Sequence, residues 1–144
     1  MLPNLFYDGN CGLCARSVQW VLAHERQRTN LVFLPLAGPS ADALRVRYPE
    51  LAGIDSLIWH DKDDATGDRV RTKSGAVLEV LSYVGGGWRV LALLGASVPR
   101  PVRDAAYDLV ARHRHGLADS TDCLIPTAQQ RRRFPEMPAS PPHP

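Results

Sequence analysis

Two short apolar runs on either side of a helical pattern constrain the fold of this 144-residue chain most strongly. The first run, Leu5–Tyr7, ends at a turn-forming Asp-Gly-Asn, and the second occupies Leu31–Leu34. Between them, apolar residues recur at spacings of four, seven and eight from Cys14, which predicts a helix over about 11–26. A strand, a helix and a strand in this order form a βαβ unit with a parallel strand pair.

The chain beyond this unit predicts a β-hairpin and four further helices. The hairpin strands fall at 56–60 and 69–72 and flank a polar, turn-rich segment. The helices are expected at about 41–48, 76–84 and 88–94 and after Pro101, with serines 40 and 74 as N-caps. A βαβ unit followed by a hairpin and a helix, with extra C-terminal helices, is an α/β fold with the order of a thioredoxin-like core.

The helix after Pro101 is clearly amphipathic. Its apolar residues share one face and occupy positions 102, 105, 106, 109 and 110. Asp108 and Arg112 have the spacing of an ion pair along the helix. This segment is therefore predicted to be helical over most of its length.

Composition indicates a soluble globular protein. Hydrophobic residues make up 44% of the chain and charged residues 22%, and the net charge of +2 gives no indication of nucleic-acid binding. The segment Val77–Val98 is long enough to span a bilayer, but it contains Glu79, Arg89 and a run of glycines. We therefore expect two short buried helices joined by a glycine turn. With no secretory signal apparent, a cytoplasmic location is predicted.

The chain is predicted to hold one domain and a tail. Residues 1–126 form the domain, and residues 127–144 read as a basic and then proline-rich tail that is disordered. The short run Arg131–Arg133 is expected to be solvated, because single basic triplets are common on surfaces.

Two of the three cysteines, Cys11 and Cys14, fall at the junction of the first strand and the first helix. Residues three apart share one face of a helix, so the two sulfurs can approach to disulfide distance. The free N–H groups of the helix N-terminus favour a thiolate at Cys11, whereas Cys14 begins the apolar face. This asymmetry predicts dithiol exchange with Cys11 as nucleophile and Cys14 as resolving thiol. Asp8 either accepts a proton from Cys14 or orients the loop.

Other interpretations of the cysteines are weaker. A zinc site needs four ligands, and Cys11, Cys14, Cys123 and a histidine at 113 or 115 lack the usual spacing. We therefore assign no metal and no cofactor. Cys123 is interpreted as a packed small residue, with a third redox thiol or a link between two chains left open. The two histidines are placed at a helix end, where cations complement the helix dipole.

The stretch DGNCGLC resembles the signature of the DCC family of thiol-disulfide oxidoreductases, named for the motif D-x-x-C-x-x-C. Its three motif residues are Asp8, Cys11 and Cys14. The segments TKSGAVLEVL and VPRPVRDAAYDLVARHRHGLA and the late DCLIP also resemble the family, so the likeness covers Leu2–Pro126.

The resemblance implies a thioredoxin-like fold and protein-disulfide reductase activity on a disulfide-containing protein or a small thiol. Well-studied thioredoxins have a cis-proline before the third strand, whereas the segment Ala52–Ser56 here has no proline. Asp55 or Ser56 takes that position. The absent proline keeps a second hypothesis open: a thioredoxin-like binding or adaptor module, with or without a metal, that performs no redox turnover.

Overall fold

The fold is described from a computed structural model. It describes residues 3–7, 12–25, 30–54, 56–63, 67–113 and 131–136, and for residues 12–15, 62 and 63 it describes the backbone alone. The statements below concern these residues.

Four strands form one mixed sheet, in the order β2-β1-β3-β4. Their bounds are Asn4–Tyr7 (β1), Val32–Pro35 (β2), Ile58–Asp63 (β3) and Gly67–Thr72 (β4). β1 pairs in parallel with β2, as a βαβ unit requires, and antiparallel with β3, and β3 and β4 form the hairpin. The predicted βαβ unit and hairpin are both confirmed.

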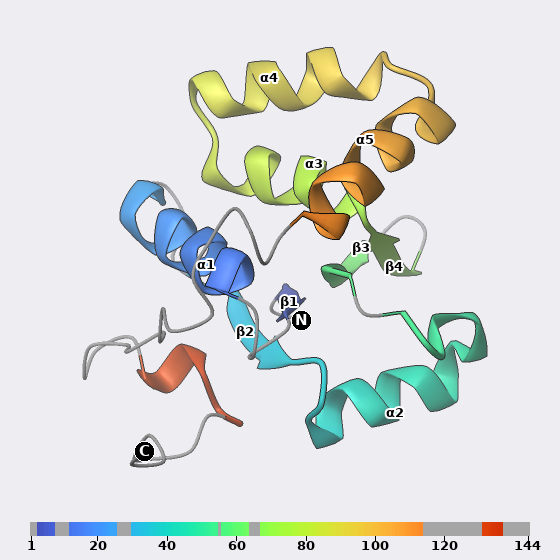
Figure 1. The fold of residues 1–144 in the computed structure, drawn as a ribbon. Helices are drawn as coiled ribbons and strands as arrows, with labels where there is room; N and C mark the ends of the chain where they lie inside the picture. Colours follow the sequence, from blue (N-terminus) through green and yellow to red (C-terminus); the bar gives the residue numbers. More distant parts are fainter. Residues whose placement is uncertain are drawn as a thin grey trace.

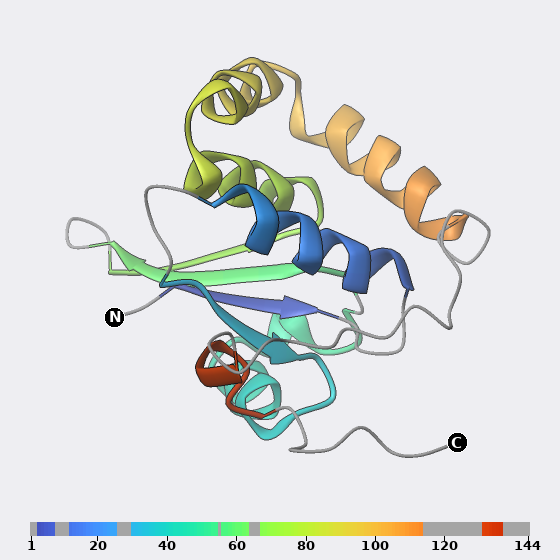
Figure 2. The ribbon, with the colours of Figure 1, turned by 90° about the vertical axis from the view of Figure 1, so that its left-hand side faces the viewer.

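The helices lie on the two sides of this sheet. Their bounds are Gly12–His24 (α1), Pro39–Arg47 (α2), Ser74–Val84 (α3), Gly87–Ala96 (α4) and Arg100–Arg112 (α5), with short 3-10 turns at Pro49–Leu51 (η1) and Arg131–Arg133 (η2). α2 and η2 lie on one side, and α1, α3, α4 and α5 lie on the other (Figures 1 and 2). The predicted α/β class is confirmed, and the arrangement is consistent with a thioredoxin-like fold.

The core consists of two apolar layers because side chains alternate along each strand. In β1, Leu5 and Tyr7 face the layer under α1 and α3, whereas Phe6 faces the layer under α2. Val18 and Val21 are fully buried, which confirms the predicted inner face of α1. β1, an inner strand of the sheet, thus contributes to both layers.

Both predicted serine N-caps are wrong, because each serine makes a tertiary contact instead. Gly38 precedes α2 without a side-chain cap, and the Ser40 amide donates to the Glu136 carboxylate at 3.1 Å. Lys73 precedes α3, and the Ser74 hydroxyl donates to Asp104. In both cases a residue distant in sequence satisfies the start of the helix.

The expected burial of the fourth helix is also wrong. Ala92 is the buried residue of α4, and Leu93 and Leu94 are 66% and 63% exposed. α5 has no buried residue, and its predicted apolar face lies outward, with Val102 and Leu109 each 58% exposed. Asp108 pairs with Lys73 at 3.2 Å and not with Arg112, so that predicted pair is wrong as well.

Residues 131–136, which the sequence placed in a disordered tail, pack against the edge of the sheet. Phe134 is 3% exposed and stacks on Phe33 at a centroid distance of 4.9 Å. Arg133 donates to the carbonyl of Leu31 at 2.9 Å and to both carboxylate oxygens of Glu25. For Arg133 and Phe134, the expectation of a solvated tail is wrong, while the domain boundary as a whole stays a prediction.

No helix among the described residues is long and apolar enough to cross a bilayer.

Candidate functional site

The cysteine motif begins after β1 in the sequence and ends in the first turn of α1. β1 ends at Tyr7 and α1 begins at Gly12, so Cys14 is the third residue of the helix. Asp8 and Cys11 lie outside the described residues, as does Cys123, and of Cys14 the structure describes the backbone. The roles of Cys11, Cys14 and Asp8 therefore stay predictions, and the surroundings of the motif are described below.

Three strands bring their ends together beside the motif. Tyr7 is in register with Pro35 of β2, and Phe6 with Ile58 of β3. The Tyr7 carbonyl accepts a hydrogen bond from the Leu36 amide at 2.8 Å. Burial raises the pKa of Tyr7 to about 12, so its phenol stays neutral and closes the strand against the core. The end of β1 is therefore held by a backbone hydrogen bond and by a buried side chain.

The segment before β3 lies at the same edge. It corresponds to the position where thioredoxins have a cis-proline and this chain has none. Ser56 is buried, and Asp55 lies outside the described residues. The Leu57 amide donates to the Tyr107 hydroxyl at 3.1 Å, and the Leu57 carbonyl accepts from the Lys73 amide at 3.2 Å. Both backbone groups of Leu57 are thus used within the fold, and α5 is held against the segment before β3.

A polar cluster at this edge was missed by the sequence reasoning. It joins the start of α3 to the inner face of α5 and comprises Lys73, Ser74, Asp104, Tyr107 and Asp108. The hydrogen bond from Ser74 holds the pKa of Asp104 below its usual value, so Asp104 stays ionised. The signal was present in the sequence as a second face of the last helix, on which polar residues recur at positions 103, 104, 107 and 108.

Lys73 occupies a strained backbone conformation within this cluster. Its φ of 52° is the one positive φ among the described residues other than glycine, and such conformations cost about 1–3 kcal/mol. The ion pair from its Nζ to Asp108 and the bond from its amide to Leu57 hold it in place. The turn from β4 into α3 is therefore fixed by contacts from two other elements.

His113 and the three tryptophans make hydrogen bonds or packing contacts within the fold. His113 follows α5, and its Nδ1 lies 2.9 Å from the Leu109 carbonyl, as expected at a helix end. His115 lies outside the described residues. Trp59 is buried, and Trp20 packs edge-on against Trp88 at 4.9 Å. Within the described ranges, no cluster of three or more histidines, cysteines or acids could hold a metal ion.

A mixed sheet with a parallel β1–α1–β2 unit, an antiparallel hairpin and a C-x-x-C sequence at the end of β1 defines a protein of the thioredoxin-like class. Comparison with known families identifies which kind. The chain belongs to the DCC1-like thiol-disulfide oxidoreductase family, whose model matches residues 5–119.

Two curated relatives support this assignment. The chain is 30% identical to YuxK, an uncharacterized protein of Bacillus subtilis, over 138 residues, which is 92% of this chain and 95% of the relative. It is also 30% identical to a chloroplastic DCC family protein of Arabidopsis thaliana over 121 residues, 83% of this chain and 67% of the relative. No solved structure matches the chain.

Proposed function

We propose that this protein is a thiol-disulfide oxidoreductase of the protein-disulfide reductase type, which works through Cys11 and Cys14. The observation that carries the proposal is the position of Cys14 in the first turn of the 13-residue helix α1, the helix that follows β1 in the chain. The N–H groups of a helix N-terminus favour a thiolate there. Membership of a family named for thiol-disulfide exchange supports the same chemistry.

The reaction proceeds in two exchange steps. The Cys11 thiolate attacks one sulfur of a substrate disulfide, forms a mixed disulfide and releases the other substrate sulfur as a thiolate. The Cys14 thiolate then attacks the Cys11 sulfur, forms the Cys11–Cys14 disulfide and releases the second substrate thiolate. Two electrons pass from the dithiol to the substrate, and a dithiol donor reduces the protein for the next cycle. Asp8 accepts the Cys14 proton or orients the loop.

The test is to trap the mixed disulfide. We expect Cys14→Ser to accumulate a covalent adduct with a disulfide substrate that dithiothreitol releases, because the resolving thiol is missing. Cys11→Ser should form no adduct, and Cys123→Ser should behave like the wild type. Failure of Cys14→Ser to form an adduct, together with a wild type that does not reduce a model disulfide, would contradict the proposal.

Metal analysis separates this function from that of a binding or adaptor module. The protein is purified without chelator, and its zinc content is measured for the wild type and Cys11→Ser. We expect no stoichiometric zinc. A stoichiometric zinc that disappears in Cys11→Ser would favour the binding module. The Cys11–Cys14 pair would then bind a metal and perform no redox turnover.

A further inference from the structure

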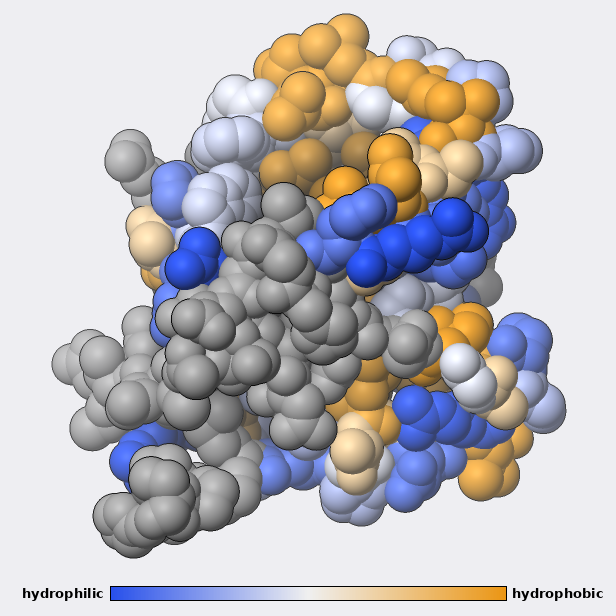
Figure 3. Space-filling view, viewed as in Figure 1, coloured by the Kyte–Doolittle hydropathy of each residue, from blue (hydrophilic) through white to orange (hydrophobic). Residues whose placement is uncertain are grey.

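Exposed apolar side chains gather on two neighbouring helices. Of the ten large apolar residues that are exposed among those with described side chains, nine lie between positions 88 and 110. These nine residues, here called the α4–α5 face, are Trp88, Val90, Leu91, Leu93, Leu94, Val98, Val102, Leu109 and Val110. Figure 3 shows apolar residues gathered over the upper part of the molecule, where α4 and α5 lie. A concentration of this kind marks an interaction surface.

The packing of each helix explains why its large apolar residues are exposed to solvent. α4 approaches α3 through small residues: Ala92 is buried, and a Cβ on Gly95 would stand 2.8 Å from a methyl group of Leu78. The larger side chains of α4 therefore project away from α3. α5 is held to the molecule by its polar residues, through the bonds of Asp104 and Tyr107, so its apolar residues lie outward.

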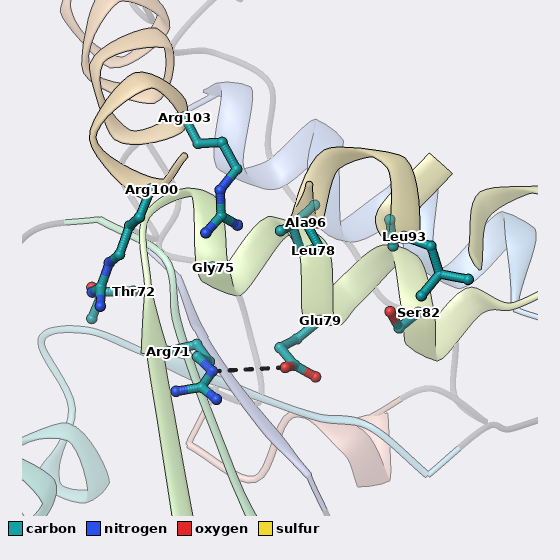
Figure 4. A pocket seen from close by; sticks show the side chains of 11 residues that line it. Arg71, Thr72, Gly75, Leu78, Glu79, Ser82, Leu93, Ala96, Arg100 and Arg103 are labelled. Carbon is teal, nitrogen blue, oxygen red and sulfur yellow. Dashed lines mark ion pairs between the residues drawn. The ribbon is translucent and has the colours of Figure 1, made fainter. Parts of the chain in front are cut away.

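A cationic hollow borders this face. It has a volume of about 320 Å³ and is lined on one side by Arg71, Arg100 and Arg103 and on the other by apolar residues that include Leu78 and Leu93 (Figure 4). Leu93 belongs to both the hollow and the α4–α5 face. The hollow therefore offers positive charge beside an exposed apolar surface.

The hollow holds three arginines, of which Arg100 pairs with Asp104 at 3.5 Å. Glu79 is the one acid that lines it, and it pairs with Arg71 at 3.9 Å and with Arg69 at 3.6 Å. Arg103 makes no ion pair among the described residues, and its Nε is buried without a hydrogen-bond partner there. A buried donor without a partner costs free energy, so an anionic ligand at this position would stabilise the site.

The outward charge of the two helices is positive. Asp104 and Asp108 are the two acids between positions 87 and 113, and they bind Ser74 and Lys73 on the inner side, with Asp104 also pairing with Arg100 at 3.5 Å. The exposed charges beside the apolar residues include Arg89 and Arg112. A surface of leucine, valine and tryptophan with arginines around it matches the composition of helices that lie in a membrane interface.

We propose that the α4–α5 face docks this protein on the surface of a bilayer that contains anionic phospholipids, with a headgroup phosphate in the arginine hollow. The apolar side chains enter the boundary between headgroups and acyl chains, and the arginines meet the negative surface. A symmetric dimer through the same face would bring the arginines of two copies together, and the acids that pair with Arg71 and Arg100 would leave Arg103 without a partner among the described residues. The proposal does not depend on the thiol chemistry, so either one stands if the other fails.

The test is co-sedimentation of the full chain with vesicles. We expect binding to vesicles of phosphatidylcholine with phosphatidylglycerol, little binding to phosphatidylcholine alone, and weaker binding as sodium chloride is added. The double variant Leu93→Ser with Leu94→Ser should bind at least about tenfold more weakly, because two exposed apolar side chains no longer enter the interface. Arg103→Gln and the exposed Arg89→Gln should each weaken binding about fivefold.

Matched controls lie on the opposite side of the sheet. Val46 on α2 is the tenth exposed apolar residue, at 81% exposure, and Arg132 in η2 is an exposed arginine. α2 and η2 lie across the sheet from α4 and α5 (Figure 2). Val46→Ser and Arg132→Gln should therefore bind vesicles like the wild type, and far-UV circular dichroism should show every variant folded.

Three results would overturn the proposal. The first is a wild type that does not sediment with either vesicle or that binds both equally. The second is a control variant that weakens binding as much as Leu93→Ser with Leu94→Ser. The third is a dimer in sedimentation velocity that dissociates in this double variant, which would assign the face to a second copy of the chain.

Discussion

The 131–136 segment and the α4–α5 face each lie where their composition would not suggest: the charged segment lies against the core, and the apolar face lies in solvent. The first is rich in arginine and lies against the core, with Phe134 3% exposed. The second is rich in leucine and valine and lies in solvent, with Leu93 66% exposed. The difference teaches that the partner available to a side chain, and not its polarity alone, decides which side of a segment faces inward.

Arg133, the inward-facing arginine of the first region, is paired with a buried carboxylate. The Glu25 side chain is 5% exposed and that of Arg133 is 15% exposed, and the Tyr83 hydroxyl donates to Glu25 at 2.8 Å. The same hydroxyl accepts from the Leu31 amide at 3.2 Å, and burial raises the pKa of Tyr83 to about 12. This closed network satisfies each group, which removes most of the cost of burying the charges.

The largest effect is expected from breaking this ion pair. Arg133→Met leaves the Glu25 carboxylate buried and unpaired, so the free energy of unfolding should fall by about 3–5 kcal/mol. Urea denaturation measures the change. The exposed Arg132→Met should change stability by less than about 0.5 kcal/mol. Adding Glu25→Leu to Arg133→Met should recover most of the loss, and a single Arg133→Met as stable as the wild type would show that the pair does not hold the segment.

A smaller, pH-dependent effect is expected at His60, which is buried without a close ion pair. Its Nε2 lies 3.9 Å from Asp68, and burial lowers its pKa below the usual 6.5. The unfolded chain therefore binds the proton more readily, so this contribution to stability is present above about pH 6.5 and is lost as the pH falls below it. His60 thus contrasts with Arg133, whose charge is paired with the Glu25 carboxylate.

Denaturation at pH 7.5 and 5.5 tests this expectation. His60→Gln should lose less stability than the wild type between the two pH values. Asp68, Arg47 and Asp61 also act on His60 and are unchanged in this variant. Equal pH dependence in the wild type and His60→Gln would contradict the expectation.

The smallest effect is expected on the α4–α5 face itself. Leu109→Ser replaces a side chain that is 58% exposed, so the free energy of unfolding should change by less than about 0.5 kcal/mol. Thermal or urea denaturation without lipid measures it. A loss of 2 kcal/mol or more, as buried leucines give, would mean that this face is covered in solution.

Much of the fold follows from local patterns in the sequence. Apolar periodicity predicted the βαβ unit and the hairpin, because the spacing of residues that share a face is set by the local backbone. The same periodicity states which residues share a face, but not whether that face meets the core. α5 shows the limit: its apolar residues were grouped correctly, yet Asp104 and Tyr107 hold the other face to the molecule.

Of the candidate site, the position of the motif relative to the first strand and the first helix was predictable. The order of apolar runs and turn signals predicted that the motif lies between the first strand and the first helix, and Cys14 lies in the first turn of α1. The polar cluster was not predictable, because its contacts join residues far apart in the chain: Ser74 with Asp104 and Leu57 with Tyr107. The recurring polar residues of α5 showed which residues share a face, but not which distant residues they bind.

The position of Arg133 also orders events during synthesis. Glu25, Leu31 and Tyr83 leave the ribosome long before their arginine does, so the nascent chain carries an unpaired carboxylate and an incompletely covered β2, which is an edge strand. Exposed strand edges pair readily with other chains. We therefore expect a chain that ends before residue 131 to aggregate more readily than the finished protein.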